Sequence, residues 1–115
     1  MMHHNHTELI ALLQDCANAC EHCATSCLQE NDVKMMSDCI KLDRDCADMC
    51  RLAAALLIRD SVIGHQFLLL CEEICELCGK ECEKHNHAEH CRACAENCKR
   101  CAKACHAHHE MITQK

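Results

Sequence analysis

The sequence predicts an all-α fold, an antiparallel up-down-up-down four-helix bundle with a cysteine-lined core. The 115-residue chain has no proline and only two glycines, and it is rich in Ala, Leu, Glu and Lys, which favours helix. Its sixteen cysteines recur in steps of three, four or seven residues, the spacing of one helix face. They form four blocks: Cys16, Cys20, Cys23 and Cys27; Cys39, Cys46 and Cys50; Cys71, Cys75, Cys78 and Cys82; and Cys91, Cys94, Cys98, Cys101 and Cys105.

The first two blocks predict two helices joined by a short turn. The first helix is expected over residues 7–28, and the polar residues 29–31 form the turn. The second helix is expected over residues 32–59. Asp43 lies on its inward stripe, where the pattern would otherwise place a cysteine. This side chain is either an additional metal ligand or a hydrogen-bond acceptor in the core.

The last two blocks predict the second pair of helices. These are expected over residues 62–84 and 87–111, with a turn at residues 60–61 between the second and third helices. Turns this short force successive helices to lie antiparallel. The length suits one domain, residues 1–115.

Composition excludes several classes of function. The formal charge of −6 and the single aromatic residue argue against nucleic-acid binding. No apolar run approaches the roughly 18 residues of a membrane span, and the first residues do not resemble a signal peptide. We therefore expect a cytoplasmic protein with reduced thiols, for which metal binding is a better explanation than disulfides. No residues resemble a catalytic constellation, so we do not expect an enzyme.

Cu(I) matches the cysteine pattern in both softness and charge. It is a soft d10 ion that is stable with two or three thiolate ligands. Residues three or four apart on a helix have Cβ atoms about 5–6 Å apart, so one ion fits between two such thiols. Sixteen buried thiolates would repel one another, and one Cu(I) per thiolate neutralises them. The sequence therefore predicts Cu(I) storage, with roughly 16 ions per chain.

Three other interpretations of the cysteines stay open. A zinc or general thiolate buffer, resembling a metallothionein, would need about eight Zn(II) ions and tetrahedral sites built from at least two helices. An iron–sulfur or redox protein is suggested by Cys16-x3-Cys20-x2-Cys23, although helical periodicity alone produces this spacing. A disulfide-bonded bundle fits the even number of cysteines, but bonds between residues four apart on one helix are strained.

The two ends of the predicted bundle differ. The chain termini and the 60–63 turn form the terminal end, where the inward stripe becomes an apolar plug of Leu9, Leu13, Ala53, Leu57, Leu68 and Ile112. Several histidines also fall at this end: His3, His4, His6, His106, His108 and His109. They either bind metal loosely or belong to disordered termini, and we favour the second interpretation.

The turns at residues 29–31 and 84–88 form the loop end, where the cysteines continue almost to the rim. The next positions on the inward stripes are Met36, His85 and His87, with His90 beside them. Thioether and imidazole groups are weaker, exchangeable ligands for Cu(I). We therefore predict that copper enters here and is passed inward by Met36, His87 and His90.

Two further groups are expected on the surface. His22 lies off the inward stripe, between Cys20 and Cys23. Five apolar residues extend the hydrophobic surface beyond one stripe and predict a subunit interface: Leu52, Leu56, Ile58, Leu69 and Leu70.

Taken together, the four cysteine blocks resemble those of the bacterial copper storage proteins, specifically the unexported cytosolic branch, over essentially the whole chain. The resemblance implies a homotetramer of four-helix bundles that stores many Cu(I) ions on thiolates, with histidine or methionine ligands near an open mouth. The second block departs from the pattern because it has three cysteines with Asp43 in the gap. The candidate ligands are thus the sixteen cysteines together with Met36, Asp43, His87 and His90.

Overall fold

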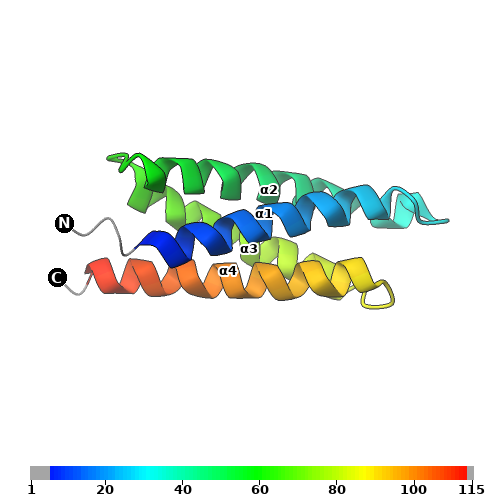
Figure 1. Cartoon of the computed structure of the whole chain (residues 1–115). Helices are drawn as coiled ribbons and strands as arrows, with labels where there is room; N and C mark the ends of the chain where they lie inside the picture. Colours follow the sequence, from blue (N-terminus) through cyan, green and yellow to red (C-terminus); the bar gives the residue numbers. More distant parts are fainter. Residues whose placement is uncertain (1–5, 114–115) are drawn as a thin grey trace.

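Four α-helices joined by short turns make up the part of the chain that the computed structural model describes, residues 6–113, with side chains described to residue 110. The four-helix bundle predicted from the cysteine spacing is confirmed (Figure 1). The helices are α1 (Thr7–Cys27), α2 (Ser37–Ile58), α3 (Gly64–Glu83) and α4 (Glu89–Thr113), and a short 3-10 helix, η2 (Val33–Met36), precedes α2.

The helices form an elongated bundle with principal extents of 50 × 22 × 18 Å. Helix α1 packs on α2 and α4, and α3 packs on the same two helices. The start of α1, the end of α4 and the α2–α3 turn share one end, as predicted, while the other two turns form the loop end (Figure 1). Helices α3 and α4 approach closely at Gly79, where a Cβ atom would lie 3.3 Å from the Cβ of Cys98.

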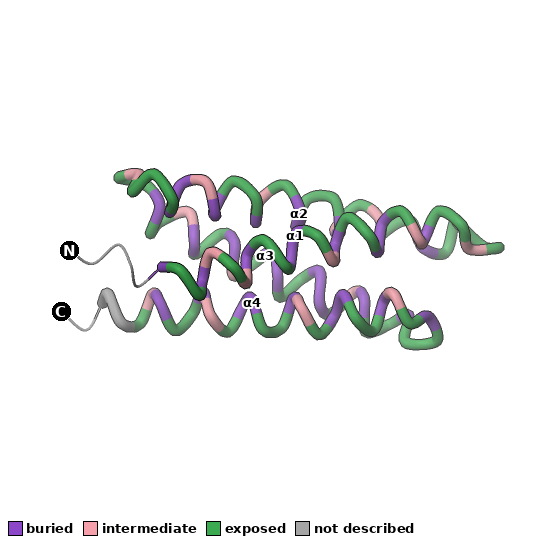
Figure 2. Tube along the Cα trace, in the orientation of Figure 1, coloured by how far each residue is buried: buried purple, intermediate pink, exposed green. Residues whose placement is uncertain are grey.

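The inward stripes form the core of the bundle, as the sequence predicts. Every cysteine is at most 1% exposed. Buried positions recur along each helix and alternate with exposed turns of the same helix (Figure 2). The apolar plug at the terminal end is also present, with Leu9, Leu13, Ala53, Leu57 and Leu68 all buried. Ile112, the sixth member of the predicted plug, lies outside the described side chains.

The predicted start of the second helix at residue 32 is wrong. Residues 33–36 form the 3-10 helix, and α2 begins at Ser37. The side chain of Asp32 accepts a hydrogen bond from the backbone N–H of Met35, 3.4 Å away, and so caps the 3-10 turn. Such short turns commonly precede an α-helix, and here the turn carries Met36 into the core at 0% exposure.

The third helix begins two residues later than predicted because α2 ends in a Schellman motif. The N–H of Ser61 donates to the carbonyl of Leu56 at 2.9 Å, and the N–H of Asp60 donates to the carbonyl of Leu57 at 3.1 Å. Asp60 takes the left-handed conformation, with φ of 57°, which aspartate tolerates better than most residues. The chain therefore reverses before α3, and Val62 is left 96% exposed.

The fourth helix also differs from the prediction at both ends. It begins at Glu89 rather than at His87 and continues to Thr113 rather than stopping at Met111. His87 consequently lies in the α3–α4 turn and is exposed, so it does not lie on the inward stripe as predicted.

The prediction of a subunit interface is wrong for one of its five residues. Leu56 is only 5% exposed and belongs to the core of the single chain. The other four residues are exposed, by 44% to 63% of their surface: Leu52, Ile58, Leu69 and Leu70. They leave apolar surface on α2 and α3.

Candidate metal centre

The thiols lie closest to one another between helices rather than along them. Sulfur–sulfur contacts in the core span 3.6–4.0 Å. Cys94 of α4 and Cys20 of α1 are 3.6 Å apart, whereas Cys23 and Cys27, both on α1, are 4.0 Å apart. The sequence predicts ions between thiols of one helix, with sulfurs that bridge along the stripe or across to a neighbouring helix, and the structure brings sulfurs of neighbouring helices as close as 3.6 Å.

The core ligands gather into groups of four that span three helices. Within each group, every ligand atom lies within 4.8 Å of the others. Three groups are linked through Cys16, Cys20, Cys46 and Cys98, two more share Cys23 and Cys39, and Asp43 joins the two sets through its contacts with Cys78 and Cys94. The groups include Cys16, Cys46, Cys50 and Cys75; Cys16, Cys20, Cys46 and Cys98; Cys20, Cys78, Cys94 and Cys98; Cys23, Cys27, Cys39 and Cys91; and Cys23, Cys39, Asp43 and Cys82.

The sulfur separations suit a soft metal ion with three or four thiolate ligands. A metal–sulfur bond of about 2.3 Å places the ligands of a tetrahedral site about 3.8 Å apart and those of a trigonal site about 4.0 Å apart. The observed contacts of 3.6–4.0 Å fit both geometries. The sulfur–sulfur distances therefore fit Zn(II) as well as Cu(I). The feature that separates the two metals is the sharing of sulfurs between groups.

Burial in the core favours the neutral form of a thiol. All sixteen cysteines are free and buried. Burial raises the pKa of the Cys27 thiol, and it raises the pKa of Cys91 to about 11. Since thiolates are the metal-binding form, each ion that enters must displace protons from the core.

Asp43 lies inside the thiol array at 0% exposure. Its Oδ1 atom accepts hydrogen bonds from the thiols of Cys78, Cys94 and Cys82, at 3.1, 3.3 and 3.5 Å. The thiol of Cys39 donates to Oδ2 at 3.7 Å. Burial, followed by the nearby Cys94 and Cys78, raises the pKa of Asp43 to about 11. In the metal-free bundle Asp43 is thus a neutral hydrogen-bond acceptor, and a role as metal ligand stays a prediction.

At the loop end, the structure brings His87 and His90 to a carboxylate that the sequence interpretation missed. His90 Nε2 lies 3.3 Å from Glu30 Oε2, and His87 Nε2 lies 3.9 Å from Glu30 Oε1. Glu30 and His90 line a surface depression of about 410 Å³. Among the described residues, His90 Nε2 forms no hydrogen bond, and the Glu30 carboxylate is its ion-pair contact. Met36, at the end of η2, is fully buried.

A second carboxylate accompanies His85 at this end. His85 is 7% exposed, and its Nε2 atom lies 3.0 Å from Glu81 Oε2, one turn earlier on α3. The spacing of four residues was the only sequence signal for this pair. Glu30 gave no such signal, because it meets the histidines only through the packing of α1 on α4.

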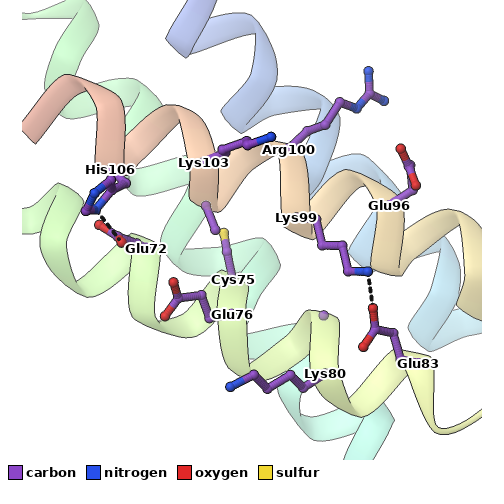
Figure 3. Close-up of a pocket in the computed structure, with 12 residues that line it drawn as sticks. Glu72, Cys75, Glu76, Lys80, Glu83, Glu96, Lys99, Arg100, Lys103 and His106 are labelled. Carbon is purple, nitrogen blue, oxygen red and sulfur yellow. Dashed lines mark hydrogen bonds and ion pairs between the residues drawn. The ribbon is translucent and has the colours of Figure 1, made fainter.

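The groove between α3 and α4 is not part of the thiol array. It encloses about 840 Å³ and is lined mainly by charged side chains, with Cys75 at its base (Figure 3). Several of these charges are paired: His106 Nδ1 lies 3.1 Å from Glu72 Oε2, and Lys99 contacts Glu83. Cys75 is only 1% exposed, so this side of the bundle offers copper a poor route inward.

The remaining histidines separate into two kinds. His22 is exposed, as predicted, and its ring lies within hydrogen-bond distance of Ser26. At the terminal end, His106 is exposed, whereas His6 and His108 are each only 8% exposed. The predicted disorder of this group is therefore wrong for the buried pair, and His3 and His4 lie outside the described residues.

Comparison with known proteins decides the family. A family model described as copper storage protein matches residues 2–110. The chain belongs to the copper storage protein family. This confirms the resemblance seen in the four cysteine blocks. The family is described by the role of copper storage.

Individual relatives agree with this assignment. A Bacillus subtilis protein described as an uncharacterized cysteine-rich protein, YhjQ, is 49% identical over 80 residues, 70% of this chain and 73% of its own length. The Cu(I)-bound copper storage protein BsCsp3 is 44% identical, with a TM-score of 0.85 over 89% of this chain and 95% of that one. A cytosolic copper storage protein from Streptomyces lividans, solved with five coppers, is 37% identical, with a TM-score of 0.90 over 94% of both chains.

Proposed function

We propose that this copper storage protein holds many Cu(I) ions on the thiolates that line its bundle. The observation that carries the proposal is the core of sixteen buried, free thiols, most of which lie in groups that share sulfurs. A sulfur that belongs to two groups can bridge two ions. Cu(I) accepts such low coordination by soft ligands, so the array acts as one large store.

Charge favours Cu(I) over Zn(II) in this core. Four separate tetrahedral Zn(II) sites would use all sixteen thiolates and leave a net charge of about −8 in a dry interior, which is energetically costly. One Cu(I) per thiolate leaves the core neutral. The shared sulfurs also conflict with four isolated tetrahedra.

Anaerobic titration of the reduced, metal-free protein with Cu(I) in the presence of a chromogenic chelator tests the proposal. We expect a stoichiometric break at about 16 Cu(I) per chain, with about one proton released per ion because the buried thiols start protonated. Zn(II) added to the Cu(I)-loaded protein should release no copper. A break at only a few ions, or displacement of Cu(I) by Zn(II), would refute storage and favour the zinc buffer.

We also propose that copper enters at the loop end. The support is the surface depression lined by Glu30 and His90, with His87 near the same carboxylate and Met36 fully buried at the same end of the bundle. Carboxylates attract the cation to this end, and imidazoles bind it weakly enough to pass it on. Cys27 and Cys91, which lie 3.9 Å apart, are the first thiols behind this surface.

Removing the imidazoles tests this route. The double variant His87→Ala/His90→Ala should load Cu(I) several-fold more slowly in stopped-flow experiments. The same slowing is expected for Met36→Leu, which keeps the side-chain volume but lacks the sulfur. The final capacity should stay the same because no thiol is lost. The variant His22→Ala, which removes an exposed histidine away from this end, is the matched control. Loading at the rate of the unmodified protein in both loop-end variants would rule out this entrance.

The proposed setting is the cytoplasm, and the proposed assembly is a homotetramer. Among the described residues, no helix is long and apolar enough to cross a membrane. The Streptomyces lividans relative is described as cytosolic, and free thiols suit a reducing compartment. The exposed apolar residues Leu52, Ile58, Leu69 and Leu70 on α2 and α3 supply a surface for subunit contacts.

A further inference from the structure

Three histidines from three different helix ends meet at the terminal end of the bundle. His65 Nδ1, at the start of α3, lies 3.0 Å from His108 Nε2, near the end of α4. The two rings are stacked, with centroids 5.1 Å apart. His6, which precedes α1, places its ring edge-on to both, at 5.1 Å from His108 and 5.9 Å from His65.

On α1 and α3 this cluster lies beyond the buried leucines of the apolar plug, whereas on α4 His108 is one turn from the core thiol of Cys105. His6 and His65 each lie three residues from a buried leucine of the plug, Leu9 and Leu68. His6 and His108 are 8% exposed, whereas His65 is exposed. The cluster is therefore built into the fold, yet solvent reaches it through one side.

The chemistry of the cluster is that of a nitrogen-ligand metal site. Two neutral imidazoles 3.0 Å apart share one proton. When that proton moves to the other nitrogen of the same ring, both facing nitrogens offer lone pairs to a metal ion. Nitrogen ligands about 2.0–2.1 Å from a tetrahedral Zn(II) lie about 3.4 Å apart, so the facing nitrogens of His65 and His108 need to separate only slightly. A neutral imidazole carries one N–H and offers a metal ion the lone pair of its other ring nitrogen.

We propose that His6, His65 and His108 form a second metal site, for one divalent ion of the Zn(II) class, with a fourth position open to solvent. Three imidazoles suit borderline divalent metals, while the thiolates of the core suit Cu(I). The bound ion links the beginning of α1 to α3 and α4, and so fastens the terminal end. This inference does not depend on the proposed storage function.

Zn(II) titration of the Cu(I)-loaded protein, in which the thiols are occupied, tests the site by calorimetry. We expect one Zn(II) per chain in addition to any weak surface binding. His65→Ala, which changes an exposed side chain, and His108→Ala should each weaken this binding at least about tenfold, a loss that removal of even an outer-shell partner can cause. His106→Ala, which removes an exposed histidine of the same helix, should leave it unchanged.

Histidine ring ¹⁵N chemical shifts of the same Cu(I)-loaded protein provide a second readout, which reports directly on the ligand nitrogens. In the unmodified protein, Zn(II) should shift the ring nitrogens of His65 and His108 together, at one equivalent. Equal Zn(II) affinity in the unmodified protein and in His65→Ala, no binding at all, or unmoved His65 and His108 resonances would each overturn the proposal.

Discussion

Loading the reduced, metal-free protein with Cu(I) is expected to raise its Tm by about 20 °C or more. Thiols in the folded bundle are already positioned, with sulfurs of three helices 3.6–4.0 Å apart. The unfolded chain also binds copper, but it must pay the entropy of gathering its ligands. Two ions that each favour the native state 100-fold raise the free energy of unfolding by about 5 kcal/mol. In a domain of this size, each kcal/mol raises the Tm by about 4 °C.

Thermal melts followed by circular dichroism measure both the helicity of the metal-free protein and the rise in Tm on loading. The metal-free protein should already be helical and melt cooperatively, because protonated cysteine packs as a small apolar residue. Zn(II) loading is the matched comparison, and we expect a smaller rise because its sites leave uncompensated charge in the core. An unfolded metal-free chain, or a Tm that Cu(I) leaves unchanged or lowers, would contradict the preformed array.

The helical stripes could be predicted because periodicity is a local property of the sequence. Steps of three and four residues place every cysteine on one face of its helix, and the structure buries all of them. Helix ends were harder to predict, since apolar residues such as Val62 fit a helical pattern equally well. The turn there depends on the left-handed Asp60, which the spacing of hydrophobic residues does not reveal.

Contacts between helices could not be predicted from spacing alone. Which residues face one another depends on the relative height of neighbouring helices, and the turns set that height through a few backbone angles. Glu30 with His90, and His65 with His108, meet only because α1 and α3 pack beside α4 at one particular register. His65 was therefore missed as a partner of the terminal histidines.

The variant Asp43→Asn is expected to remove a loss of stability that the metal-free protein shows as pH rises. The carboxyl has a pKa of about 11 in the folded bundle and about 3.9 in an unfolded chain. Between these values, the folded state holds a proton that the unfolded state lacks. The free energy of unfolding should therefore fall as pH rises, by about 1.4 kcal/mol per pH unit from this group.

Asparagine preserves the shape of Asp43 and its acceptor oxygen toward Cys78, Cys82 and Cys94, but it cannot ionise. Urea unfolding with reductant and a metal chelator, between pH 6.5 and 8.0, measures the slope for both proteins. Over this interval the unmodified protein should lose about 2 kcal/mol more than Asp43→Asn.

All other titratable groups are common to both proteins, so the difference between the slopes isolates Asp43. Equal slopes would mean that Asp43 is ionised in the folded core. The four thiols around it would then donate to a carboxylate, and the array would carry a negative charge before any copper arrives. A neutral Asp43 instead means that the empty core carries no charge at this position, and that the first ions must generate their own thiolates by releasing protons.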